Sequence, residues 1–355
     1  MKKYLVLENG MTFEGEAFGA ETDADVTAEI VFSTAMVGYV ETLTDKRYTG
    51  QAVCQTFPII GNYGVNEADC EGDAITPAAY IVREYCDAPS NFRSEETLGA
   101  FMKKHGIPGL CGIDTRLLTK TLRDNGTMNG VITSDPMKAD LGAGKAYRIT
   151  GAVDAVSAKD VRLETSSAEG GHYKVALLDL GVSKSVIAEL NRIGCDVYVL
   201  PHDTTAEAIL NLKPDGLFVS GGPGDPAECA DAAETLKALI PSNIPTMAVG
   251  LGHQLLAMAN GMTTKKLPYG HRGTNHPVRC TATGHLYITS QNHGYAVEAV
   301  DTAVAEESFV NVNDKSNEGL EYKNIPAFSV QFMPDTNEIS ANTEYLYKKF
   351  TEMMK

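Results

Sequence analysis

The chain has 355 residues, 43% of them hydrophobic and 21% charged, which is the composition of a soluble globular protein with room for two cores. Its formal charge of -16, without any Lys/Arg-rich run, argues against binding to nucleic acid. No apolar segment has the length of a membrane span, and Glu8 and Asn9 interrupt the short apolar run that precedes them. We therefore expect a cytoplasmic protein that is neither exported nor inserted into a membrane.

The first third of the sequence predicts a β-rich domain with few helices. Two amphipathic patterns indicate helices over 95–105 and 116–124, and Asp114 or Thr115 can cap the second one. From about residue 135 the pattern weakens, and the segment 166–171 (SSAEGG) is typical of a linker. We expect a first domain over 1–150, a linker over 151–171 and a second domain over 172–355. Short strands of the first domain are predicted at 4–7, 12–16, 30–32, 51–57 and 80–83.

After residue 172 apolar strands alternate with amphipathic helices. This alternation predicts an α/β domain whose parallel sheet is covered on both faces, with ligands at the carboxyl ends of the strands. The tail 342–355 spaces Leu346, Phe350 and Met353 as one face of a last helix. Strands are predicted at 174–180, 195–200, 216–220, 246–249, 286–289 and 327–331.

The segment 245–261 (PTMAVGLGHQLLAMANG) predicts a strand, a sharp turn at Gly250 and a helix that Gly261 ends. α/β enzymes present a nucleophile on such a turn, because the turn exposes the side chain and leaves the next N–H free for an oxyanion. A Cys or Ser is required there, and this chain has Gly250. For this segment by itself, we favour the simpler explanation that the glycine permits a tight connection between strand and helix.

Two further motifs are expected at strand ends. The loop 220–226 (SGGPGDP) could hold a ligand against backbone N–H groups, but it lacks the Lys-Ser/Thr of a phosphate-binding loop. The segment 291–295 (QNHGY) could hold a small polar ligand such as an amino acid, or it could be structural polar packing. We expect the segment 271–276 (HRGTNH) to be a polar loop, and no third ligand accompanies its two histidines. The seven cysteines are scattered without ligand spacing, so we predict reduced thiols and no metal.

The segments SGGPGDP, GLGHQLLAMANG, YGHRGTNHPV and SQNHGYAV resemble, in this order, the glutamine amidotransferase domain of the carbamoyl phosphate synthetase small subunit. The earlier segments LVLENGMTFEGEAFGA, VFSTAMVGYVETLTD, FPIIGNYGVN, PSNFRS and HGIPGLCGIDTRLLT are similar to that subunit's first domain. The resemblance implies a β-rich small-subunit domain followed by a flavodoxin-like class I amidotransferase domain with a mostly parallel sheet. It also implies a heterodimer with a large subunit, which holds ATP and magnesium, while this chain needs no cofactor. In that family, glutamine hydrolysis supplies ammonia for carbamoyl phosphate synthesis in the arginine and pyrimidine pathways.

The resemblance also assigns site residues by position. The family's nucleophilic Cys falls on Gly250, its histidine on Met333 and the acid behind it on Asp335. A serine that holds glutamine falls on Arg47. Because glycine offers no nucleophile and methionine no proton-accepting nitrogen, we expect no glutaminase activity. The remaining glutamine-binding positions keep compatible residues: Gly222, Gly224, Leu251, Gln254, Asn292, Gly294 and Tyr295.

Three interpretations follow. The first is a small subunit without glutaminase activity, a structural or regulatory companion to a large subunit that uses free ammonia. The second is a non-catalytic module that still binds glutamine, although Arg47 in place of a small hydroxyl residue argues against normal binding. The third is an enzyme with a substitute thiol, Cys229 or Cys280. We favour it least, because Cys280 is well outside the elbow and Cys229 lacks a base.

Overall fold

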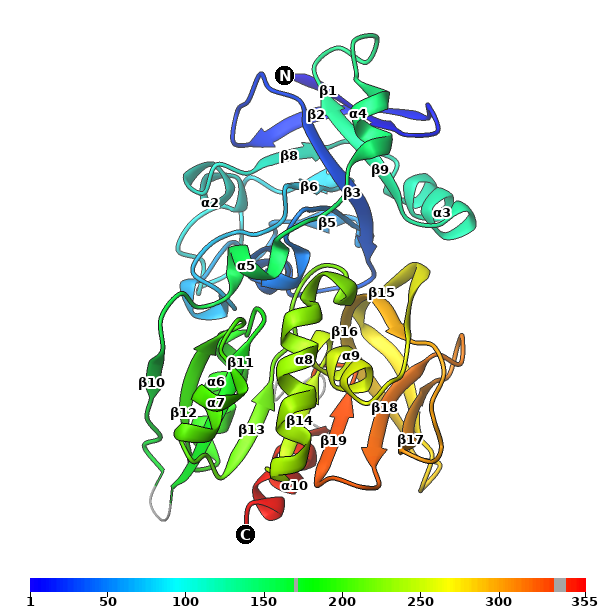
Figure 1. Ribbon diagram of the computed structural model, residues 1–355. Helices are drawn as coiled ribbons and strands as arrows, with labels where there is room; N and C mark the ends of the chain where they lie inside the picture. Colours follow the sequence, from blue (N-terminus) through cyan, green and yellow to red (C-terminus); the bar gives the residue numbers. More distant parts are fainter. Residues whose placement is uncertain (169–171, 335–342) are drawn as a thin grey trace. The chain divides into compact units, whose positions relative to one another are not determined.

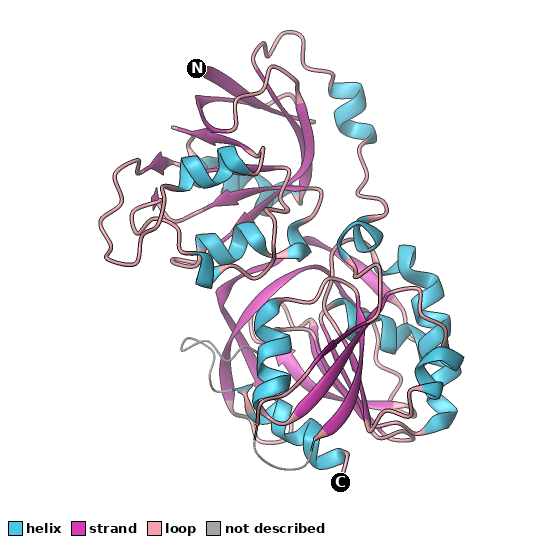
Figure 2. Ribbon diagram, turned by 90° about the vertical axis from the view of Figure 1, so that its left-hand side faces the viewer, coloured by secondary structure: helices cyan, strands magenta, loops and turns pink. Residues whose placement is uncertain are grey.

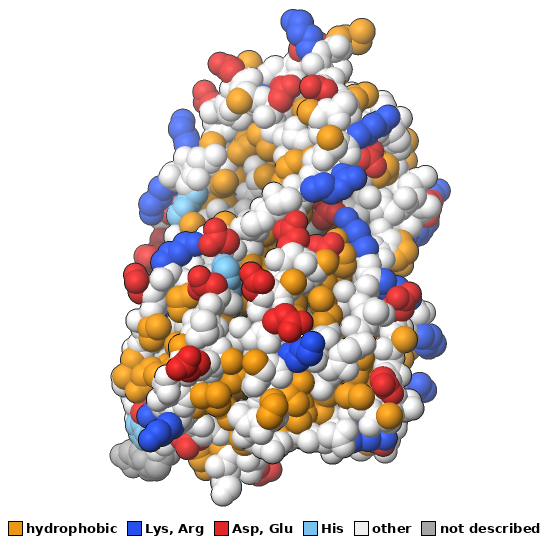
Figure 3. Space-filling model, viewed as in Figure 1, with side chains coloured by type: hydrophobic (Ala, Val, Ile, Leu, Met, Phe, Trp, Pro, Cys, Tyr) orange, Lys and Arg blue, Asp and Glu red, His pale blue; other side chains and the backbone are white. Residues whose placement is uncertain are grey.

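The computed structural model describes residues 1–168, 172–334 and 343–355, and the chain forms two compact units (Figure 1). Unit 1 comprises Met1–Thr150 and Pro268–Arg272, and unit 2 comprises Gly151–Leu267 and Gly273–Lys355. In the part of the chain that the structure describes, no helix has the length and apolarity needed to cross a membrane. On the face shown in Figure 3, basic side chains are dispersed among acidic and uncharged ones.

Unit 1 is built on a closed barrel with the strand order β1-β2-β8-β6-β4-β3-β9. Alternate residues of each strand face the interior, where Leu5 and Leu7 of β1 pack against Phe13 and Ile30. This confirms the β-rich first domain. The strands are β1 (Lys2–Leu7), β2 (Thr12–Gly19), β3 (Val26–Ser33), β4 (Gln51–Gln55), β6 (Ala79–Ile81), β8 (Pro108–Cys111) and β9 (Met128–Thr133), and a separate pair joins β5 (Ile59–Ile60) to β7 (Glu84–Tyr85).

Both helices predicted for the first domain are confirmed, as α2 (Leu98–Lys104) and α3 (Thr115–Asn125). Asp114 caps α3, because its Oδ1 accepts a hydrogen bond of 2.9 Å from the backbone N of Leu117. Leu118 and Leu122 of α3 belong to the same apolar cluster as the barrel interior, so this helix closes one end of the barrel. The other helical segments of unit 1 are α1 (Tyr39–Thr44), η1 (Lys46–Tyr48), η2 (Glu67–Asp69) and α4 (Leu141–Ala146).

Unit 2 contains a ten-stranded sheet in the order β10-β12-β11-β13-β14-β19-β18-β17-β15-β16. Strands β12, β11, β13, β14 and β19 pair in parallel, while β10 and β18 add antiparallel on either side of them. The strands are β10 (Arg162–Glu164), β11 (Tyr173–Asp179), β12 (Cys195–Pro201), β13 (Gly216–Val219), β14 (Thr246–Val249), β15 (Thr264–Cys280), β16 (Leu286–Val297), β17 (Ala305–Asn311), β18 (Asn317–Tyr322) and β19 (Ala327–Val330).

Helices cover both faces of this sheet, as Figure 2 shows, and the α/β prediction is therefore confirmed. Side chains of β11 alternate between two apolar clusters, with Ala176 and Leu178 in one and Val175 and Leu177 in the other. The first cluster includes α7 (Ala206–Asn211), α8 (Ala230–Leu239) and α9 (Leu251–Ala259), and the second includes α6 (Lys184–Arg192) and α10 (Tyr345–Met353). The short segments η3 (Pro226–Cys229) and η4 (Ile240–Ser242) flank α8.

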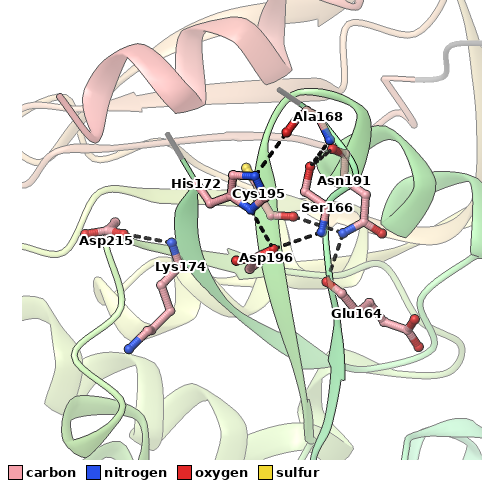
Figure 4. A network of polar contacts seen from close by, with 9 residues as sticks. All are labelled: Glu164, Ser166, Ala168, His172, Lys174, Asn191, Cys195, Asp196 and Asp215. Atoms are coloured by element: carbon pink, nitrogen blue, oxygen red, sulfur yellow. Dashed lines mark hydrogen bonds and ion pairs between the residues drawn. The ribbon is translucent and has the colours of Figure 1, made fainter. Parts of the chain in front are cut away.

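The segment that we expected to be a linker carries two elements, α5 (Ala152–Val156) and β10. Figure 4 shows how its polar groups are tied to the sheet. Asn191 Nδ2 donates to the carbonyl oxygen of Glu164 at 2.9 Å, and the backbone N of Ser166 donates to Asp196 Oδ1 at 2.8 Å. His172 lies 3.1 Å from the same carboxylate oxygen. Since β10 is a sheet edge with little apolar contact, its sequence carries no alternating pattern from which a strand could be predicted.

Two local predictions for the second half of the chain were wrong. The segment 271–276 is not a loop, because it lies inside β15. The segment 291–295 does not follow a strand, because β16 continues through it to Val297. Both strands belong to the antiparallel part of the sheet, where backbone pairing accommodates polar side chains that do not form a continuous apolar run.

Candidate active site

The predicted elbow is present. Strand β14 ends at Val249, α9 begins at Leu251, and Gly250 between them has φ 57° and ψ -115°. This combination lies outside the regions that L-residues adopt without strain. The turn is anchored to the neighbouring strand, because the backbone N of Gly250 donates to the carbonyl oxygen of Val330 at 2.9 Å.

The elbow has room for the side chain that it lacks. A Cβ on Gly250 would lie 3.4 Å from Gly221 Cα and 3.8 Å from the carbonyl oxygen of Gln331, which are ordinary van der Waals distances. Gly252 differs, because a Cβ there would overlap the carbonyl oxygen of Val219. The N–H of Leu251 starts the helix and so has no intrahelical acceptor, as an oxyanion donor requires.

The glycine loop follows β13, the strand next to β14, so it reaches the same edge of the sheet as the elbow. Ser220 shapes the loop: its Oγ accepts from the backbone N of Leu180 at 2.9 Å and donates to the carbonyl oxygen of Gly221 at 2.9 Å. A Cβ on Gly222 would overlap the carbonyl oxygen of Leu180, and Gly224 has φ 89°. Both positions therefore require glycine to keep the loop in this conformation.

Met333 follows β19, which pairs in parallel with β14 so that Val330 lies opposite Val249. Gly250 and Met333 are thus placed at the ends of adjacent strands. Met333 is 4% exposed and belongs to an apolar cluster with Phe332, and its backbone N donates to the carbonyl oxygen of Ser290 at 3.0 Å. The thioether contributes apolar packing and no basic nitrogen. Asp335 lies outside the described residues.

Gln254 connects the elbow helix to β16. Its side chain is 3% exposed, and Nε2 donates to the carbonyl oxygen of Tyr295 at 2.7 Å and to Gln331 Oε1 at 2.9 Å. Asn292, Gly294 and Tyr295 are half-buried in the same strand. The structure therefore brings the elbow, the glycine loop and the 291–295 segment into one unit.

A buried carboxylate that sequence reasoning missed supports this arrangement. Glu318 in β18 is fully buried, and its two oxygens accept hydrogen bonds of 3.0 Å from Gln291 Nε2 and Asn311 Nδ2. The backbone oxygen of Glu318 also accepts from the backbone N of Gln331 at 2.9 Å. Gln291 Oε1 in turn lies 2.8 Å from His293 Nε2. The Glu318 side chain therefore links three strands, β16, β17 and β18. Nothing in the local sequence NEGLEY distinguishes Glu318 from a solvent-exposed glutamate.

His253 of the elbow helix does not replace the missing base. It is fully buried, its Nδ1 lies 2.8 Å from Ser329 Oγ, and burial lowers its pKa to about 3. Such an imidazole stays neutral and enclosed in the core. Arg47 belongs to unit 1, where it lies in η1 and its Nε pairs with Asp45 Oδ1 at 2.7 Å.

Neither Cys229 nor Cys280 is placed to act as a substitute nucleophile. Cys229 lines a cavity of about 130 Å³ together with Gly224, but burial raises its pKa to about 11, so the thiol stays protonated near neutral pH. In Cys280, burial opposes ionisation, yet hydrogen bonds to Thr283 and Ala282 together lower the pKa. Cys280 ends β15, which is separated from β14 in the sheet by β19, β18 and β17.

Each of the two units matches a known protein family. Residues 5–132 match the family described as carbamoyl-phosphate synthase small chain, CPSase domain, and residues 176–353 match glutamine amidotransferase class-I. The carbamoyl phosphate synthase small chain of Bacillus thuringiensis subsp. konkukian is 44% identical over 360 residues, covering 100% of this chain and 96% of the relative. This chain belongs to the carbamoyl phosphate synthase small-chain family.

Two more relatives extend the match. The carbamoyl phosphate synthase pyrimidine-specific small chain of Bacillus subtilis is 42% identical over 359 residues, with 100% of this chain and 96% of the relative covered. The small chain of Streptococcus agalactiae is 42% identical over 357 residues, with 100% and 98% covered. The similarity therefore spans both units of this small chain. The elbow at Gly250 lies within the part that matches the class I glutamine amidotransferase family.

Proposed function

We propose that this small chain has lost glutamine hydrolysis and acts as a structural or regulatory companion of a carbamoyl phosphate synthase large chain that uses free ammonia. The nucleophile position is Gly250 and the base position is Met333. By analogy with hydrolase triads, loss of either partner lowers turnover by roughly 10⁶-fold, and loss of both adds little more.

The observation that carries this proposal is the elbow itself. Gly250 keeps a strained turn, an adjacent N–H without an intrahelical acceptor and space for a side chain, yet it has no atom that could attack an amide. Met333 is packed into an apolar cluster. The architecture that would support the reaction thus persists without the reacting groups.

The test is ammonia release from glutamine by the purified full chain, followed with a coupled glutamate dehydrogenase assay. We expect no release above that of the buffer, and the double variant Cys229→Ser/Cys280→Ser should give the same result. Glutamine hydrolysis at about one turnover per second, within the usual range of enzymes, would contradict the proposal. Loss of such turnover in one cysteine variant would identify a substitute thiol.

The companion role needs a second measurement. The small chain is mixed with a carbamoyl phosphate synthase large chain, and carbamoyl phosphate formation from ammonium is compared with and without it. We expect a stable complex and an altered rate with ammonium, and no synthesis when glutamine replaces ammonium. If the two chains do not associate, the companion role is wrong, while the loss of glutaminase activity still stands on the first assay.

A second candidate function is glutamine binding without hydrolysis. It is supported by the glycine loop and by the 291–295 segment, which Gln254 holds beside the elbow. Calorimetry with glutamine on the full chain tests it. Saturable binding without ammonia release would favour a glutamine sensor, and the absence of heat would favour the companion role.

A further inference from the structure

The open end of the unit 1 barrel carries a cavity with no place in the proposed function. The cavity measures about 460 Å³, within the range of roughly 300–1,000 Å³ that small-molecule sites occupy. It lies where β1 and β3 begin and β2 and β9 end, since Lys3, Val26, Gly19 and Ile132 all line it. Helix α3 closes the opposite end of the barrel.

The alternation of side chains along β1 places Lys3 on the face that points into this cavity. Leu5 and Leu7 of β1 face the barrel interior, and side chains on a strand alternate, so Lys3 shares their face. The pairing agrees, because Leu5 lies opposite the interior Phe13 and Lys3 opposite Gly15, two residues further along the same face. Lys3 is only 5% exposed.

The ammonium group of Lys3 is incompletely satisfied. An ammonium has three donors, and Lys3 Nζ makes one hydrogen bond, of 2.7 Å, to the carbonyl oxygen of Thr22. Among the described residues, no carboxylate oxygen lies within 4.0 Å of it. Burial of a cation without a counter-charge is unfavourable, and an anion that enters the cavity would relieve it.

The rest of the lining restricts the kind of anion. Val26, Pro108 and Ile132 offer apolar surface for the body of a ligand. Glu21 and Asp23, both exposed, also line the cavity and disfavour a multiply charged anion such as a polyphosphate. The charge and the apolar lining together suit a single carboxylate on a short hydrocarbon chain.

We propose that the open end of the unit 1 barrel binds a small organic monocarboxylate, with the carboxylate on Lys3 Nζ and the hydrocarbon body against Val26, Pro108 and Ile132. The site lies within unit 1 and is separate from the amidotransferase elements of unit 2. A ligand there would bind only the folded unit and would stabilise it by mass action. This inference is independent of the proposed loss of glutaminase activity.

The experiment titrates the full chain with butyrate and with butyramide, which has nearly the same shape and no charge, by ligand-observed NMR. We expect saturable butyrate binding and at least about tenfold weaker butyramide binding, because a charge-assisted hydrogen bond is lost. From acetate to hexanoate, each added methylene should strengthen binding by up to about fourfold. Inorganic phosphate should not compete with butyrate.

Two variants locate the site. Lys3→Met keeps an unbranched side chain that is one atom shorter and removes its charge, so it should weaken butyrate binding to the level of butyramide. Lys2→Met is the matched control, since Lys2 is 69% exposed and forms an ion pair with Glu14 outside the barrel. Absence of saturable binding, equal binding of butyrate and butyramide, or full binding to Lys3→Met would each overturn the proposal. If Lys3→Met does not fold, the comparison of butyrate with butyramide on the unaltered chain decides.

Discussion

Replacing Gly250 with alanine tests whether the elbow still stores backbone strain. The structure separates strain from steric clash at this position, because the new Cβ would be at least 3.4 Å from the atoms around it. A non-glycine residue in this conformation costs roughly 1–3 kcal/mol, from which a reduced unfolded-state entropy removes roughly 0.4–1 kcal/mol. We therefore expect Gly250→Ala to destabilise unit 2 by about 0.5–2 kcal/mol.

Gly252→Ala is the matched comparison, because Gly252 lies two residues further along, inside α9. Alanine suits a helix better than glycine, yet the Cβ at Gly252 would overlap the carbonyl oxygen of Val219. Backbone displacement of this kind typically costs about 1–3 kcal/mol and occasionally more, so Gly252→Ala should also destabilise unit 2, but through steric overlap and not through backbone strain. Urea unfolding of the full chain, followed by fluorescence and circular dichroism, measures both. A Gly250→Ala chain as stable as the parent would refute the strain argument.

Three other predictions concern ionisable groups. His253 has a folded-state pKa of about 3 against roughly 6.5 when unfolded. The free energy of unfolding of unit 2 should therefore fall as pH drops below about 6.5, by about 2 kcal/mol near pH 5. In urea titrations, His253→Asn should remove this pH dependence. Hydrogen bonding to Asp196 raises the pKa of His172, so any stability it adds is present below about pH 6.5 and is lost as pH rises through the raised pKa. NMR titration should show that Asp196→Asn lowers this pKa, and an unchanged value would exclude the contact in solution. Iodoacetamide labelling followed by mass spectrometry should modify Cys280, whose pKa is lowered, before Cys229, whose pKa is raised, and the reverse order would contradict the assigned environments.

The strands of unit 2 that sequence reasoning found are those with continuous apolar runs, such as β11 and β14. Their burial on both faces leaves a signal in every residue. The long strands β15 and β16 were missed or cut short because they carry polar side chains throughout. Gln291 shows why: it is 4% exposed, but its amide bonds to Glu318, a partner 27 residues away. No local pattern specifies such a pairing.

The amino-acid sequence by itself determined the chemistry of the elbow, since glycine at 250 and methionine at 333 lack reactive groups in any fold. It also identified the family, because the motifs that define it are contiguous in the chain. Only the tertiary structure decided which polar groups are buried and what they meet. Lys2 and Lys3 are adjacent and chemically identical, yet closure of the barrel leaves one in solvent and turns the other inward. The physical reason is that side-chain chemistry is local, whereas burial depends on strand pairing between residues far apart in sequence.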